Sequence, residues 1–408
     1  MKKTYLLFFF LLSHALVRAQ SFGFVLDEDK KEVEIPFEIY NNFMVVKVVI
    51  NKSFPLKFIF DTGAEHTILN KSILVGPLGL NYDRTIKILG ADLNTPIMAF
   101  VSTKVHIKVG NAKAPTQDIL VLANDYFKID EYVGMEVHGI VGADLFRNLV
   151  IRIDYRRNLI HLQRAKDFKP PRKKKWKKVN ATIERNKPYL FSQAKINDKM
   201  VDAKLLIDTG ASLSLLLHTN TSPDIQLPET YIRGSIGKGL GGFLEGFLGR
   251  LRRLEFGDFY FNNVITNYQD ISDSLTMKSI SYRNGIFGSA LLQRFDIIIN
   301  YPEEKIYMQP HRRYNKDFKY DKSGLELIVT GKKLRTITIY NVIEQSPGSE
   351  VGLQKGDEII SVNGLSARLL GLKGLSKRFT KKAGKRIKIK IKRNGEKMTF
   401  IFKLRDLI

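Results

Sequence analysis

The sequence predicts a mainly β protein with two similar lobes and a smaller third domain at its C-terminal end. Residues 58–64 read Phe-Ile-Phe-Asp-Thr-Gly-Ala and residues 205–211 read Leu-Leu-Ile-Asp-Thr-Gly-Ala, so an apolar run that ends in Asp-Thr-Gly occurs twice. Short apolar segments alternate with turn residues over most of the chain, which is typical of strands. From about Tyr320 onward the pattern changes and no third copy follows. Repetition on this scale determines the architecture of a fold.

The similarity extends well beyond the two Asp-Thr-Gly tripeptides. In each lobe a strand candidate and a turn come before the motif, and an apolar-apolar-glycine triplet follows it much later. A further apolar strand comes after each triplet. The corresponding stretches are 44–60 and 188–207, then 140–142 and 286–288, then 149–154 and 295–300. We therefore expect an N-terminal lobe over residues 20–165 and a C-terminal lobe over residues 179–315.

Composition limits the kinds of site that the chain can carry. It has 408 residues and no cysteine, which excludes disulfides, a thiol nucleophile and cysteine-based metal sites. The 7 histidines show no pair at metal-ligand spacing, and no Gly-x-Ser-x-Gly elbow or P-loop is present. We therefore expect neither a metal nor another cofactor. The net charge of +25 predicts affinity for anionic surfaces.

The N-terminus has the pattern of a secretory signal peptide. Two lysines are followed by an apolar run over residues 5–12 and by the small residue Ala19. The run is shorter than the roughly 20 residues that a membrane span needs, which favours cleavage over an uncleaved anchor. We predict a signal peptide over residues 1–19, cleavage before Gln20, and export to the periplasm or the cell exterior.

A basic stretch separates the two lobes. Residues 166–178 contain two adjacent prolines and many lysines, which predicts a linker. A solvated connector is one interpretation, and contact with an anionic cell envelope is the other. Few aromatic residues interleave with the basic ones, so we expect no nucleic-acid binding.

The repeated motif suits acid–base chemistry when its two copies face each other. The glycine allows a second backbone to approach closely, and the threonine hydroxyl can hydrogen-bond across a symmetric interface. The carboxyl groups of Asp61 and Asp208 would then lie side by side and share one proton. One carboxylate can take a proton from water while the other donates a proton to a carbonyl oxygen, which hydrolyses an amide.

These paired motifs and their glycine triplets resemble the aspartic protease superfamily over about residues 33–310. The resemblance implies two pseudo-symmetric retropepsin-like β-barrel lobes that form one aspartic protease domain. It implies Asp61 and Asp208 as the catalytic pair and a peptide or unfolded protein as the substrate. We also expect a monomer. The supporting residues would be Thr62, Gly63, Gly142, Thr209, Gly210 and Gly288.

Glycine-rich stretches mark where a hairpin could cover the substrate in each lobe. They are Gly90-Ala91-Asp92 and residues 237–242. Retropepsin-like enzymes have two such flaps and pepsin-like enzymes have one; we expect two. A plain loop is the alternative for residues 237–242.

Alanine follows both Asp-Thr-Gly motifs, at Ala64 and Ala211. Pepsin-like enzymes commonly have a serine or threonine there, whose hydroxyl donates a hydrogen bond to the aspartate. Losing this donor removes stabilisation of the ionised form, which raises the pKa of the pair. We therefore expect activity at weakly acidic or neutral pH. Ser212 is a candidate replacement donor.

The C-terminal domain, residues 320–408, resembles a PDZ domain. Residues 346–364 carry the resemblance: a turn, a short helix, a Gly-Asp turn and a strand that ends at Asn-Gly. The resemblance implies that a loop and strand containing Gly324, Leu325 and Leu327 bind the C-terminal tail of another protein. Glu326 stands where the family usually has glycine. Packing against the protease lobes alone is the other interpretation.

Taken together, the sequence predicts an aspartic endopeptidase with a PDZ domain for peptide recruitment or regulation. The alternative is a non-catalytic peptide-binding scaffold that retains the protease fold. Hydrolysis of a denatured protein by the wild type and by variants of Asp61 and Asp208 separates the two hypotheses.

Overall fold

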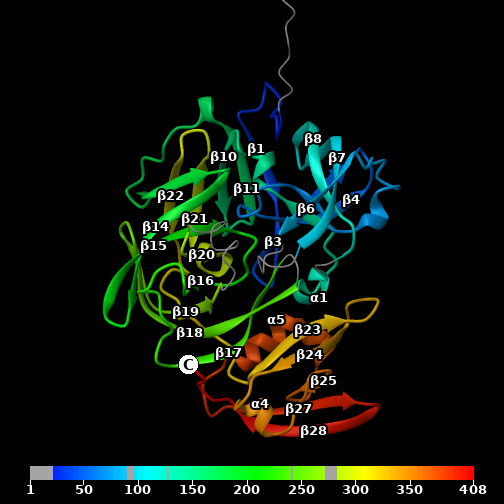
Figure 1. The fold of residues 1–408 in the computed structure, drawn as a ribbon, viewed down its shortest axis with the longest axis vertical. Helices are drawn as coiled ribbons and strands as arrows, with labels where there is room; N and C mark the ends of the chain where they lie inside the picture. Colours follow the sequence, from blue (N-terminus) through cyan, green and yellow to red (C-terminus); the bar gives the residue numbers. More distant parts are fainter. Residues whose placement is uncertain (1–21, 90–95, 126–127, 240–241, 272–282) are drawn as a thin grey trace, which may run out of the picture.

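The computed structural model describes residues 22–89, 96–125, 128–239, 242–271 and 283–408. The predicted signal peptide and its cleavage site lie outside these residues, as do Gly90, Ala91 and Asp92. Two β-rich lobes lie side by side and the C-terminal domain packs against their lower edge (Figure 1). None of the helices formed by the described residues has the length and apolar character needed to cross a membrane.

The N-terminal lobe is a six-stranded barrel. Its strands follow the order β3 (Phe43–Ile50), β4 (Pro55–Phe60), β9 (Gly139–Val141), β5 (Ile68–Leu69), β8 (Ala112–Leu122) and β7 (Pro96–Val109). Pairing of β3 with β7 closes the ring. Strands β2 (Glu38–Tyr40) and β6 (Arg84–Leu89) extend it, and η1 (Ser72–Leu74), α1 (Ile129–Val133) and η2 (Ala143–Leu145) connect strands. Asn51 and Lys52 both have positive φ, which gives the tight turn between β3 and β4.

The C-terminal lobe repeats this barrel. Its strands follow the order β14 (Lys187–Ile196), β15 (Lys199–Asp208), β20 (Gly285–Gly288), β16 (Leu215–His218), β19 (Phe259–Gln269) and β18 (Gly242–Phe256). Pairing of β14 with β18 closes the ring. Strands β13 (Ala181–Glu184) and β17 (Tyr231–Gly239) extend it, and helix α3 (Ser289–Leu292) follows β20. Asn197 and Asp198 form the turn that corresponds to Asn51 and Lys52. The predicted internal repeat and fold class are confirmed.

A six-stranded sheet joins the lobes. Its order is β1 (Glu32–Pro36), β11 (Leu159–Arg164), β10 (Leu149–Asp154), β21 (Phe295–Asn300), β22 (Lys305–Pro310) and β12 (Lys177–Val179). Strands β10 and β21 pair antiparallel across the lobe boundary. The predicted linker begins with η3 (Ala165–Asp167) and lies against this sheet, since the Arg152 guanidinium lies 6.0 Å from the centre of the Trp176 ring. One apolar core runs through both lobes and this sheet.

The C-terminal domain has a sheet and a core of its own. The sheet consists of β23 (Leu325–Thr330), β24 (Thr336–Val342), β25 (Glu358–Val362), β27 (Arg386–Arg393) and β28 (Glu396–Lys403), with β26 (Leu365–Ser366) beside β25. Helix α4 (Pro347–Glu350) starts at a capping box between Ser346 and Ser349. Helix α5 (Ala367–Phe379) buries Leu375 and Phe379 in the core. Helix α1 of the N-terminal lobe contacts β23.

Candidate active site

Two buried threonines lock the lobes together at the ends of β4 and β15. The Thr62 hydroxyl donates to the carbonyl of Ile207 at 2.7 Å, and the Thr209 hydroxyl donates to the carbonyl of Phe60 at 2.8 Å. Each hydroxyl also accepts from the backbone N–H of the other threonine, at 3.0 and 3.1 Å. Both threonines are 0% exposed. The four bonds are related by the pseudo-twofold symmetry of the lobes and position the residues on either side.

Backbone donors hold each aspartate in the turn that follows its strand. The Gly63 N–H donates to Oδ1 of Asp61 at 2.7 Å, and the Gly210 N–H donates to Oδ1 of Asp208 at the same distance. Ala64 supplies a second N–H to Asp61 at 3.2 Å. The loop N–H groups therefore fix both carboxyl groups without a hydroxyl at the alanine positions.

The two carboxyl groups meet at the lobe boundary. The Asp61 and Asp208 side chains lie close enough for each carboxyl group to shift the pKa of the other. Each also lies against the glycine of the opposite lobe: a Cβ at Gly210 would lie 2.2 Å from Cγ of Asp61, and one at Gly63 would lie 2.6 Å from Cγ of Asp208. The repeated motif thus brings together two carboxyl groups that the sequence separates, as the opposed arrangement of the lobes predicts.

The triplet strands lie directly behind the aspartates. Strand β9 runs parallel to β4, and β20 runs parallel to β15 with Asp208 opposite Gly288. A Cβ at Gly142 would lie 2.5 Å from the carbonyl oxygen of His66, and one at Gly288 would lie 2.3 Å from that of Leu213. Both glycines therefore allow close backbone contact under the motif.

Gly210→Ala is expected to displace the Asp61 carboxyl group and to lower kcat for peptide hydrolysis by about 100-fold. The added methyl overlaps that group at 2.2 Å, which also costs about 1–3 kcal/mol of unfolding free energy. Gly76→Ala is the matched control, because a Cβ there meets nothing within 4 Å. Unfolding in urea and rates on an unfolded protein measure both effects. Equal activity of the two variants would contradict the described contact.

Both aspartates have raised pKa values. Burial raises the pKa of Asp61 well above its usual range, and the adjacent Asp208 carboxyl raises it further. Burial also raises the pKa of Asp208, an effect that the adjacent Asp61 carboxyl group and the nearby Arg283 charge partly offset. The pair therefore retains one shared proton at a pH where exposed carboxyl groups have lost theirs.

The pair lies at a cavity of about 410 Å³ with walls from both lobes. Most of the wall is apolar, and the two lobes contribute similar side chains. Ile59, Ile68 and Ile140 come from the N-terminal lobe, and Leu206, Leu216 and Ile286 come from the C-terminal lobe. This cleft suits a chain segment with apolar side chains on both sides of the carboxyl groups.

Several polar residues of the cleft wall were not expected from the sequence, among them His218 and Arg283. His218 is 1% exposed, and burial together with the nearby Arg283 charge lowers its pKa to about 3, so its ring is neutral. Arg283 lies close enough to Asp208 to stabilise its charge. The two residues lie far apart in the sequence and come together only through strand pairing in the folded lobe. No sequence motif therefore marks either of them. Lys187 lies 3.6 Å from Glu65 and adds an ion pair across the lobes.

Each lobe has a hairpin where the sequence places a flap. Strands β6 and β7 form one and strands β17 and β18 form the other, with Ile88 and Leu244 lining the cavity. Residues 90–92 and 240–241 lie outside the described residues. The Ser212 hydroxyl oxygen lies 3.4 Å from the Tyr132 hydroxyl oxygen, so its described partner is on α1 and not Asp208.

The predicted peptide-binding residues lie at the start of β23. Gly324 has a φ of +77° and a Cβ there would lie 2.1 Å from Ser346, so only glycine fits. Leu325 and Leu327 line a cavity of about 260 Å³ between β23 and α5. Tyr132 and Ser235 of the protease lobes also line this groove. Leu325 and Leu327 therefore share one groove, to which the lobes add a wall, and Gly324 lines the adjoining cavity beside Leu325.

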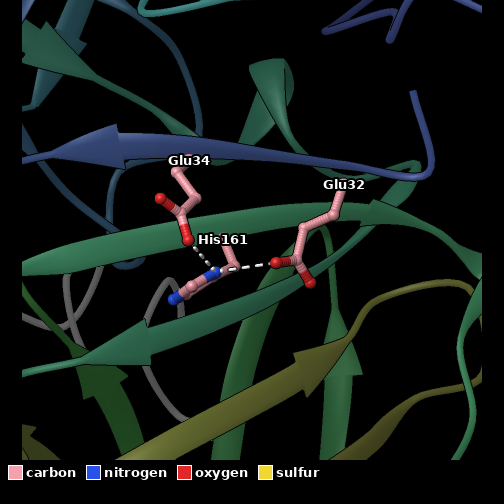
Figure 2. A group of neighbouring side chains, drawn as sticks. All are labelled: Glu32, Glu34 and His161. Carbon is pink, nitrogen blue, oxygen red and sulfur yellow. Dashed lines mark hydrogen bonds and ion pairs between the residues drawn. The ribbon is translucent and has the colours of Figure 1, made fainter. Parts of the chain in front are cut away.

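A separate group of titratable side chains lies on the sheet that joins the lobes (Figure 2). Nδ1 of His161 is 2.9 Å from a carboxylate oxygen of Glu32 and 3.5 Å from one of Glu34. The hydrogen bond from His161 lowers the pKa of Glu32. Their ligand atoms lie within 4.8 Å of one another, close enough to hold a metal ion. The hydrogen bond between His161 and Glu32 accounts for this contact without a metal ion, and these residues do not line the cleft.

Comparison with protein families agrees with this geometry. The sequence profile of the aspartyl protease family matches the chain twice, over residues 46–145 and 192–290. Both lobes therefore carry an aspartyl protease domain of this family. Each match contains one Asp-Thr-Gly motif, so the two matches are the two lobes of a bilobal aspartyl protease fold. The profile of the PDZ domain matches residues 312–404. A comparison with curated proteins gives no match.

Proposed function

We propose that this protein is an aspartic endopeptidase that hydrolyses peptide bonds with water activated between Asp61 and Asp208. The observation that supports the proposal is the adjacent carboxyl pair, held by the threonine bonds between two lobes at an apolar cleft. A scaffold that only binds peptides has no need for a shared proton at this point.

In this mechanism the ionised carboxylate of the pair takes a proton from the water, and the water oxygen bonds to the peptide carbonyl carbon. The protonated carboxyl group donates its proton to the carbonyl oxygen, which forms a neutral diol. Breakdown of the diol breaks the C–N bond and passes a proton to the leaving amine, and the pair returns to its singly protonated state. No bond forms between the enzyme and the substrate, and no cofactor takes part.

The cleft favours unfolded proteins or extended peptides with apolar side chains beside the cleaved bond. The hairpins of the two lobes would act as two flaps over such a segment.

We further propose export through residues 1–19, a monomeric enzyme, and electrostatic contact of the basic surface with an anionic cell envelope. The PDZ domain would recruit peptides or regulate access to the cleft.

Hydrolysis of a reduced, unfolded protein tests the proposal. We expect cleavage between apolar residues and inhibition by a statine-type peptide, whose hydroxyl group resembles the diol. A scaffold would bind the statine-type peptide without cleaving the protein, and that result would favour the second hypothesis.

The pH dependence of kcat/KM follows from the raised pKa values of the pair. Activity needs one protonated and one ionised carboxyl group, so raised pKa values move the active range toward weakly acidic or neutral pH. The double variant Ala64→Ser/Ala211→Ser adds hydroxyl donors for the ionised form, which lowers the pKa values. We expect its activity profile to move to lower pH. A wild-type profile that peaks at strongly acidic pH would contradict this prediction.

A further inference from the structure

Glu326 of the PDZ domain reaches into the C-terminal protease lobe. Its Oε1 accepts a hydrogen bond from the backbone N–H of Ser235 on β17 at 2.9 Å. The neighbouring Gly234 makes this approach possible, because a Cβ there would lie 2.8 Å from the same oxygen. The residue that replaces the usual PDZ glycine thus binds the backbone of the C-lobe hairpin.

A second carboxyl group occupies the loop before β23. Oδ1 of Asp321 accepts from the N–H groups of Ser323 and Gly324, at 2.8 and 3.2 Å. PDZ domains use loop N–H groups at this end of the groove to bind the carboxylate of a peptide C-terminus. Here the carboxyl group of Asp321, a residue of the same chain, already accepts hydrogen bonds from two of these loop N–H groups.

The two carboxyl groups make this end of the groove unfavourable for a third. Burial raises the pKa of Asp321 to about 6. Burial also raises the pKa of Glu326, and the Asp321 charge adds to the effect, while hydrogen bonds from Ser235 and Asn341 oppose it. A peptide carboxylate would lose its hydration beside like charges, which is costly.

We propose that this end of the PDZ groove is an intramolecular docking site for β17 and does not receive a peptide C-terminus. Strand β17 continues from Ser235 to Gly237, which lines the cleft with the two aspartates. On the other side of the groove, Tyr132 contacts Ser212, which follows the second Asp-Thr-Gly motif closely. The PDZ domain therefore holds the C-lobe hairpin at the edge of the candidate active site.

Amide hydrogen exchange of the full chain tests the docking. Glu326→Ala removes both the charge and the acceptor, and we expect Ser235 to exchange at least 10-fold faster. Glu326→Gln keeps an acceptor of the same shape, so Ser235 should stay protected. Glu344→Ala is the matched control, since Glu344 is an exposed glutamate of the same domain. Equal exchange of Ser235 in all four proteins would overturn the proposal.

Peptide binding tests the exclusion of C-termini. Two fluorescent peptides of one sequence, ending in valine with a free carboxylate or with an amide, are titrated against the wild type. We expect the free carboxylate to bind no tighter than the amide, and Glu326→Gln to improve binding of the carboxylate form. Wild-type binding that is 10-fold tighter for the carboxylate would overturn the proposal. Neither measurement requires hydrolysis, so both remain decisive if the chain proves to lack peptidase activity.

Discussion

Asp208→Asn is expected to lower kcat for peptide hydrolysis by at least about 10⁴-fold, and Asp61→Asn by a similar factor. The mechanism needs one carboxylate as base and one carboxyl group as acid, and an asparagine amide can be neither. The amide oxygen can still accept the N–H of Gly210 or Gly63, so the loops should keep their conformation. Rates on an unfolded protein measure the effect, and cleavage at the wild-type rate by either variant would end the proposal.

Measuring the unfolding free energy tests whether these variants fold. A carboxyl group whose pKa is raised in the folded state contributes stability below its unfolded pKa, and this contribution is lost as pH rises through the folded pKa. Asp61→Asn removes the titrating group, so its unfolding free energy relative to wild type should rise from acidic to neutral pH. A constant difference across this range would contradict the raised pKa.

Thr62→Val and Thr209→Val are each expected to lower the unfolding free energy by about 2–4 kcal/mol. Valine keeps the shape of threonine but leaves a buried carbonyl and a buried N–H of the other lobe without their hydroxyl partner. Urea unfolding measures the loss. Thr85→Val on β6 is the control, because Thr85 is exposed and should change the value by less than about 0.5 kcal/mol.

The double variant Thr62→Val/Thr209→Val separates a shared network from two independent contacts. Each hydroxyl accepts from the backbone N–H of the other threonine, so the residues are directly coupled. The double variant should therefore cost a different amount from the sum of the single variants, by about 0.5–3 kcal/mol. Additive losses would show that the described bonds do not act as one unit.

The sequence predicted those parts of the site that depend on local pattern. Strands alternate with turns, and Asn51 and Asn197 mark equivalent turns in the two lobes. The Asp-Thr-Gly motif can be recognised within three residues, because the turn after each strand needs a glycine. Its second copy indicates that two carboxyl groups form a pair. Pairing of β4 with β9 and of β15 with β20 then follows from the repeated triplets.

Contacts between residues that lie far apart in the sequence could not be predicted from the sequence. His218 and Arg283 join the cleft because β16 and β20 are neighbours, and no spacing between the two residues predicts that. The contact of Glu326 with Ser235 depends on how the PDZ domain packs against the C-terminal lobe, which the sequence does not show. The sequence showed only that a glutamate replaces the usual PDZ glycine. Two adjacent prolines and many lysines predicted a linker over residues 166–178. Composition does not specify that Trp176 of this stretch packs over Arg152 on the sheet between the lobes.

The central claim is that one chain builds one complete site from both of its lobes. Calorimetric titration with a statine-type peptide tests this claim directly, because binding requires both aspartates in the same cleft. We predict one peptide bound per chain, with binding lost in Asp61→Asn and equally in Asp208→Asn. One peptide per two chains would instead indicate a site built between molecules, and two per chain would indicate that each lobe acts alone. Either result would contradict the claim.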